Sequence, residues 1–189
     1  MQGSSNKKTV TQPEKFVYNL EVLCRVVTEI ARDIQKKGYN VVSPEMISLA
    51  SEYLKAKDPE KLLQNFIKYS YKHWEKIKKR NENFFGEEAS KIFPDLPSSI
   101  IELFCKLLYL EDGDNQRVIS EEQREEVWII FESFVKISIN YIHQERKPCI
   151  KIYEDGREKK RYTMKFFKEI DLEPICELWK IELIFNLPN

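Results

Sequence analysis

Between residues 127 and 142 the sequence carries an apolar residue at nearly every helical position. The run contains Val127, Trp128, Ile129, Ile130, Phe131, Phe134, Val135, Ile137, Ile139, Tyr141 and Ile142. A helix that is apolar around its whole circumference must be covered by neighbours on several sides. Ser120-Glu-Glu-Gln123 has the form of a capping box ahead of this run, and Pro148 lies beyond it. The sequence therefore predicts a central helix over about 121–144, around which the other elements pack.

A second long helix is predicted near the start of the chain. Thr11-Gln-Pro-Glu14 is another capping box, and Gly38 is suited to follow the last turn. Between them an apolar stripe recurs at steps of three and four residues: Phe16, Leu20, Leu23, Val27, Ile30 and Ile34. The polar residues 1–12 show no periodicity, and we expect them to form a flexible N-terminal arm.

Two proline-marked starts predict the next helices. Ser43-Pro44 and Asp58-Pro59 each place an N-cap oxygen before a proline at the first helical position. The helix over 44–56 is predicted to bury Met46, Ile47, Ala50 and Leu54. The helix over 59–80 is predicted to bury Leu62, Leu63, Phe66, Ile67, Ser70, Trp74 and Ile77.

Shorter helices are predicted over 87–93 and from Ser99 to about Leu110, where Ser99-Ile-Ile-Glu102 is a further capping box. The expected fold is mainly α: a single helical-bundle-like domain over 13–189, with six to seven helices around the central one. A chain of 189 residues is long enough to bury a core of this size.

The periodicity changes after Pro148. Ile150 and Ile152, and later Tyr162, Met164 and Phe166, alternate with polar residues on either side of Asp155-Gly156. This pattern predicts a β-hairpin, so residues 149–189 are expected to be a small β-containing element. Alternation also continues over Trp179–Phe185, and there a third strand and a helix over 173–185 both fit.

The charge balance narrows the classes of partner. Lysine and arginine number 31 together, as do aspartate and glutamate, so the formal net charge is zero. The whole molecule therefore has no electrostatic attraction for nucleic acid or anionic membranes, although a local patch can still bind. The longest unbroken apolar run, Trp128–Phe131, is much shorter than the roughly 20 residues that cross a bilayer. With no signal-like stretch at the start, we expect a soluble, cytoplasmic protein without a membrane partner.

The cysteines and histidines give no support for a metal or a cofactor. Cys24, Cys105, Cys149 and Cys176 lie far apart beside apolar neighbours, as reduced core cysteines do. The chain has two histidines and no Cys-x-x-Cys pair, so a structural zinc site lacks its usual spacing.

The loop at 112–123 resembles the calcium loop of an EF-hand. Counting from the first residue, the ligand positions fall on Asp112, Asp114, Gln116 and Gln123. Calcium binding is disfavoured because Arg117 stands where glycine is needed and Gln123 replaces a bidentate glutamate. The alternative, which we prefer, is a polar turn followed by the Ser120–Gln123 helix cap.

A basic segment with aromatic neighbours offers a candidate contact for nucleic acid or another partner. Its residues are Lys72, Trp74, Lys76, Lys78, Lys79 and Arg80. They could bind phosphates and stack on bases, but cations also suit the end of a helix, and Trp74 falls on the apolar stripe. A second cluster, Arg157, Lys159, Lys160 and Arg161, belongs to the predicted hairpin. A solvated helix end and an exposed hairpin tip explain the same residues.

No nucleophile-elbow, zinc-protease, dinucleotide or Walker motif occurs, so no catalytic residue is predicted. Three segments resemble the uncharacterised, Lys- and Asn-rich helical proteins encoded by large nucleocytoplasmic DNA viruses: KDPEKLLQNFI (57–67) with HWEKI (73–77), YIHQERKP (141–148) and FFKEIDL (166–172). The resemblance implies a viral accessory protein or a minor virion component in host cytoplasm or the particle. We therefore expect a non-enzymatic interaction or structural protein, with another protein or a virion assembly as partner. The alternative is a nucleic-acid-binding accessory protein that uses residues 72–80 and 157–161.

Overall fold

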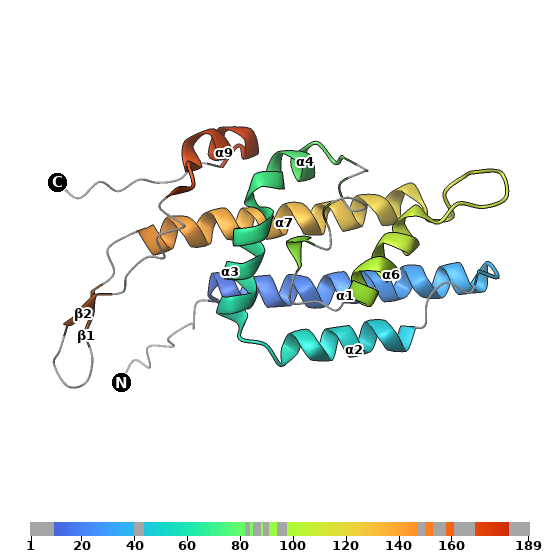
Figure 1. Cartoon of the computed structure of the whole chain (residues 1–189), viewed down its shortest axis with the longest axis horizontal. Coiled ribbons are helices and arrows are strands. Elements are labelled where there is room, and N and C mark those ends of the chain that lie inside the picture. Colours follow the sequence, from blue (N-terminus) through green and yellow to red (C-terminus); the bar gives the residue numbers. More distant parts are fainter. Residues whose placement is uncertain are drawn as a thin grey trace, which may run out of the picture.

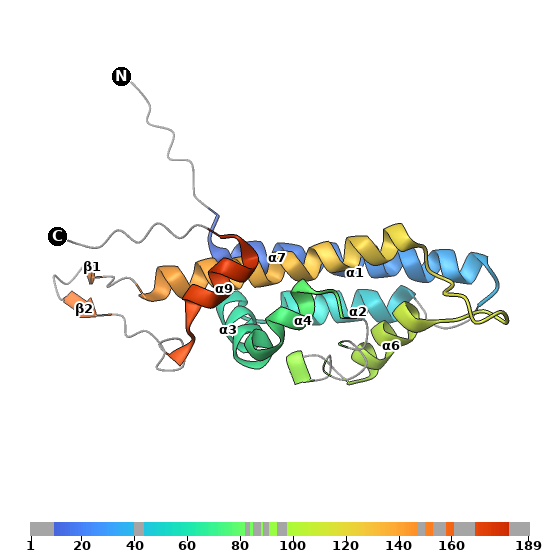
Figure 2. The same ribbon diagram turned by 90° about the horizontal axis from the view of Figure 1, so that it is seen from above.

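The computed structural model describes residues 10–39, 44–81, 84, 88, 91–93, 98–146, 150–152, 158–160 and 169–181. Two long helices, α1 (Gln12–Lys36) and α7 (Glu121–Arg146), lie side by side along its length (Figures 1 and 2). They run antiparallel. The Asn19 amide donates to Ser133 Oγ (2.7 Å), and Gln123, near the start of α7, donates to Asp33 Oδ2, near the end of α1 (3.2 Å).

Shorter helices form a second layer beneath this pair, as Figure 2 shows. They are α2 (Pro44–Lys55), α3 (Pro59–Ser70), the 3-10 turn η1 (Tyr71–His73), α4 (Trp74–Lys78) and α6 (Ser98–Tyr109). In Figure 1, α1 lies between α7 and α2. Helix α7 packs against α1, α3, α4 and α9 (Leu172–Trp179). The protein is therefore mainly helical, as predicted.

A cluster of phenylalanine rings fills the space between the two layers. Phe134 of α7 lies 4.9 Å from Phe16 of α1, 5.6 Å from Phe66 of α3 and 5.7 Å from Phe131, measured between ring centroids. All four side chains are almost completely buried. Tilted and edge-on rings at these distances attract one another beyond simple area burial, so this cluster joins α1, α3 and α7.

The helix ends follow the signals in the sequence. The reciprocal Thr11–Glu14 capping box is present, Asp58 Oδ1 caps α3 through the Glu60 N–H (2.9 Å), and Ser120 and Gln123 cap α7 reciprocally. Gly38 follows α1 at φ 89°, in the left-handed conformation that closes a helix with least strain. These predicted boundaries are confirmed.

Two predictions about the second and third helices were wrong. The helix predicted over 59–80 is interrupted by η1, because a 3-10 turn winds with three residues per turn and redirects the chain between α3 and α4. Trp74 and Ile77 remain buried after this turn. Met46, predicted to face the core, is exposed, because α2 packs against α1 and α6 through the neighbouring face that carries Ile47, Ala50 and Leu54.

Helix α7 also differs from its prediction in two respects. It extends to Arg146, two residues beyond the predicted end. Ile129 was counted with the apolar core but is 53% exposed, since it lies on a side of α7 that no described neighbour covers. The other apolar residues of the run are buried, which confirms their predicted place in the core.

The C-terminal region contains a short ladder and a helix. β1 (Ile150–Ile152) pairs antiparallel with β2 (Glu158–Lys160), with Lys151 opposite Lys159. The predicted second strand at Tyr162–Phe166 lies outside the described residues, so the larger β element stays a prediction. A helix in this region is confirmed, but the helix predicted over 173–185 was too long, since α9 occupies Leu172–Trp179, capped by Asp171 and followed by Lys180 at φ 51°. The third strand over Trp179–Phe185 lies mostly outside the described residues and stays a prediction.

Candidate functional site

The aromatic member of the basic segment is not accessible to a base. Trp74 is 1% exposed, and its indole N–H donates to Ser70 Oγ at 2.8 Å. A ring must present an open face to stack on a nucleotide. Trp74 therefore belongs to the core and does not line a binding surface.

The lysines of this segment lie on several sides, and each has a nearby contact. Lys72 lies over the Tyr71 ring (5.8 Å) and Lys78 over the Trp179 ring of α9 (4.9 Å). Lys79 pairs with Glu75, and its hydrogen bond holds the pKa of that carboxyl below the ordinary value. Of these contacts, only the pairing of Lys79 with Glu75 offsets a positive charge of residues 72–80.

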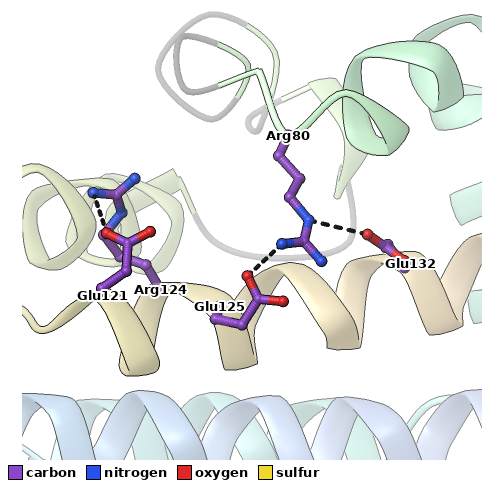
Figure 3. A network of polar contacts seen from close by, with 5 residues as sticks. All are labelled: Arg80, Glu121, Arg124, Glu125 and Glu132. Carbon is purple, nitrogen blue, oxygen red and sulfur yellow. Dashed lines mark hydrogen bonds and ion pairs between the residues drawn. The ribbon is translucent and has the colours of Figure 1, made fainter.

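Arg80 reaches from the end of α4 to two carboxylates of α7. Its guanidinium pairs with Glu125 and, through Nε at 3.2 Å, with Glu132 (Figure 3). The hydrogen bond to Glu125 is the main reason why the pKa of Arg80 is raised. Figure 3 also shows a separate pair, Arg124 with Glu121, at 3.2 Å. Arg80 therefore ties two helices together and is not directed to a ligand.

Glu88 gathers three basic side chains around one carboxylate. Lys91 lies 3.1 Å away, and His73 and Lys76 each lie 3.7 Å away. The hydrogen bond from Lys91 lowers the pKa of Glu88, while partial burial opposes this effect. Lys76, a candidate phosphate contact, thus lies beside a carboxylate.

The EF-hand-like loop is organised as a turn. The Asp112 carboxylate accepts the backbone N–H groups of Asp114 and Gln116, both at 2.9 Å. Asn115 has φ 58°, and Glu111 and Arg117 form an isolated antiparallel bridge. Gln123 accepts the Ser120 N–H and donates to Asp33. The candidate ligands Asp112 and Gln123 therefore hold the turn and the start of α7 in place.

The described part of the chain brings no three histidine, cysteine, aspartate or glutamate side chains together as a metal site. Cys24, Cys105 and Cys176 are reduced thiols, and burial raises the pKa of the first two. A thiol with a raised pKa is a poor nucleophile at neutral pH.

The second basic cluster is described in part. Lys159 and Lys160 lie in β2, whereas Arg157 and Arg161 fall outside the described residues. A shared face of the two basic clusters therefore stays a prediction.

A buried polar group that the sequence did not reveal joins α3 to α7. The Tyr141 hydroxyl donates to Glu60 Oε1 (2.8 Å) and accepts from Gln64 Nε2 (2.9 Å). Burial raises the pKa of Tyr141, so the phenol stays neutral. The alternation of apolar and polar residues cannot identify such a pair, because the partners are about 80 residues apart.

Helix α2 carries an exposed apolar strip that was also not predicted from the sequence. Met46, Leu49 and Tyr53 recur at steps of three and four residues and are 39%, 65% and 41% exposed. We call these three residues the α2 stripe. In Figure 1, α2 forms the edge of the helical body beyond α1. No helix in the described ranges is long and apolar enough to cross a bilayer.

Comparisons with protein-family models, with curated proteins and with solved structures found no match to this chain. Function is therefore inferred from its own residues and contacts.

Proposed function

We propose that this chain is a non-enzymatic interaction or structural protein that meets another protein through the α2 stripe. The main support for this proposal is that Met46, Leu49 and Tyr53 lie on one side of a helix and are all exposed. Single exposed apolar residues are ordinary, but three on successive turns form a strip from which a partner can exclude water. The resemblance of residues 57–77, 141–148 and 166–172 extends this proposal to a viral accessory protein or minor virion component.

Leu49→Ser tests this proposal, because it removes the most exposed apolar side chain of the stripe without touching the core. Recovery of specific partners from the native setting is expected to fall about tenfold or more, as for a residue central to an interface. Leu178→Ser is the matched control, since Leu178 is an exposed leucine on a different helix, α9. Equal recovery with both variants contradicts the proposal.

The second candidate function is nucleic-acid binding, which we propose as the alternative because Lys72, Lys79 and the aromatic Tyr69 are all exposed. This role needs the larger hairpin of residues 149–168 to form, with Arg157 and Arg161 near Lys159 and Lys160. Tight binding of DNA or RNA that weakens steeply with salt supports it. If the double variant Lys78→Ala with Lys79→Ala also loses affinity for nucleic acid, this function is favoured over protein interaction.

A further inference from the structure

We propose that two copies of this chain associate weakly through the solvent-facing side of α7, packed antiparallel about Ile129. This side is distinct from the α2 stripe, because α1 lies between α7 and α2 (Figure 1). Ile129 is 53% exposed, whereas the other apolar residues of its run are buried. Glu122 and Lys136 are also exposed and lie seven residues before and after it. Residues seven apart recur on nearly the same side of a helix, so these three residues form one line, which we call the α7 stripe.

The contacts of α7 border the α7 stripe without covering it. Arg80 meets α7 at Glu125 and Glu132, on one side of the stripe. The Asn19 amide of α1 meets α7 at Ser133, on the other side. Figure 2 shows α2, α3, α4 and α6 together on one side of the pair formed by α1 and α7. Within the described ranges, the stripe therefore faces solvent.

The charges of the α7 stripe are complementary to those of a second copy. When two identical helices pack antiparallel about a twofold axis at Ile129, residues at equal distances before and after it face each other. Glu122 of each copy then faces Lys136 of the other, which gives two opposite-charge pairs around the contact between the isoleucines. A parallel arrangement brings like charges together instead. The sequence of the stripe therefore favours the antiparallel pair.

The two charges of the α7 stripe are available to a second copy. Neither Glu122 nor Lys136 has an ion-pair partner among the described residues, whereas the nearby Glu121, Glu125 and Glu132 are each paired with an arginine. A second copy therefore gains these two pairs without breaking a contact within the chain.

The size of the surrounding face indicates how strong the association is. Helices α1 and α7 have 25 and 26 residues. At about 1.5 Å per residue and a width of about 10 Å each, they offer a side face of roughly 700 Å². This is close to the roughly 800 Å² per partner of a typical stable interface. Because the α7 stripe has a single apolar residue at its centre, we expect half of the chains to be dimeric only at roughly 10–100 μM.

Sedimentation velocity of the full chain over a range of about 1–300 μM measures this equilibrium. Ile129→Ser is expected to weaken dimerisation about tenfold or more, since it removes the centre of the contact. Leu49→Ser in the α2 stripe and Leu178→Ser on α9 are the matched controls and are expected to leave dimerisation unchanged. Circular dichroism confirms that each variant keeps its helical content.

Exchanging the charges tests the antiparallel register. Glu122→Lys places two lysines opposite each other in the dimer, and Lys136→Glu places two glutamates opposite each other. Each variant alone is expected to dimerise about tenfold more weakly at ~50 mM salt. An equimolar mixture of the two is expected to recover dimerisation, because the new lysine of one copy faces the new glutamate of the other. Glu52→Lys, at an exposed position of α2, is the control for net charge and is expected to have no effect.

Four results overturn the proposal. They are a chain that stays monomeric up to ~300 μM, a dimer that Ile129→Ser does not weaken, a mixture that dimerises no better than its single variants, and a dimer that Leu49→Ser abolishes. The first three leave the proposed interaction through the α2 stripe untouched, since that function is tested by recovery of native partners. The fourth places the second copy on the α2 stripe.

Discussion

Arg80 combines an unfavourable backbone conformation with a favourable side-chain pair. Its φ of 51° is left-handed, which costs a residue with a Cβ about 1 kcal/mol relative to glycine. Its partly exposed ion pairs with Glu125 and Glu132 contribute about 1 kcal/mol. We expect Arg80→Ala to lower the free energy of unfolding by about 1 kcal/mol, and Arg80→Gly to leave it nearly unchanged. Urea denaturation measures both, and equal losses would show that this backbone position is unstrained.

Two fully buried serines allow a sharper comparison of hydrogen bonds. Ser70 Oγ accepts the Trp74 indole N–H, whereas Ser138 Oγ donates to the Phe134 carbonyl one turn earlier in its own helix. Ser70→Ala leaves a buried indole N–H without its acceptor and is expected to cost about 1–3 kcal/mol. Ser138→Ala is expected to cost at least about 1 kcal/mol less, because the Phe134 carbonyl keeps its helical partner. Thermal or urea unfolding of the two variants measures these losses in stability. Similar losses at Ser70 and Ser138 contradict the expectation.

At the scale of elements, the features that could be predicted are those determined by residues close together in the sequence. The cap at Thr11, Asp58 or Ser120 acts within three residues of itself, so the sequence alone locates the helix start. The η1 turn is different, because periodicity continues through Tyr71–His73 and only tertiary packing reveals the change of winding. The alternation over Trp179–Phe185 fitted both a strand and a helix over 173–185, and the structure shows a helix, α9, that ends at Trp179. A strand and a short buried helix share this pattern over so few residues.

Glu88 makes the stability of the protein sensitive to pH. The hydrogen bond from Lys91 is the main cause that holds the pKa of Glu88 below its ordinary value of 4.5, and nearby His73 and Lys76 add to it. A carboxyl with a lowered folded-state pKa stabilises the protein above its unfolded pKa and loses this effect as the pH falls through the folded pKa. We therefore expect the wild type to melt above Glu88→Gln near neutral pH, with the difference disappearing below pH 4.5. Melting curves across this range check it.

The control for this pH dependence is Glu29→Gln, at an exposed position of α1. Its difference from the wild type is expected to stay small at every pH. A Glu88→Gln difference that persists unchanged into acid contradicts the ion-pair explanation and assigns the effect to side-chain packing.

At the scale of the whole molecule, the candidate surfaces were harder to predict than the core. The sequence correctly placed the apolar residues of α7 in the core, apart from Ile129, because a helix that is apolar on nearly all sides is covered by neighbours on most of them. It could not show that Arg80 meets Glu125 and Glu132, about 50 residues away, or that Trp74 is enclosed. Nor could the sequence show that Met46 is exposed, since periodicity indicates which apolar residues share a helix face but not which neighbours cover that face.

Phe134 is the residue on which the whole arrangement depends most directly. It is completely buried and contacts the rings of Phe16, Phe66 and Phe131, so it joins α7 to both α1 and α3. Phe134→Ala removes these contacts and leaves a cavity, which costs about 3–5 kcal/mol. Because a domain of this kind is stable by only about 5–15 kcal/mol, we expect this variant to be partly unfolded or to melt far lower.

The comparison with Phe104→Ala locates this effect. Phe104 of α6 is only partly buried and meets the cluster through Phe131, at 6.2 Å between centroids. Its loss is expected to cost at most about half as much, because solvent and neighbouring side chains can fill the space. Near-ultraviolet circular dichroism and urea unfolding measure the packing and the stability of both variants. Equal losses at the two positions contradict a fold centred on the contact of α1, α3 and α7.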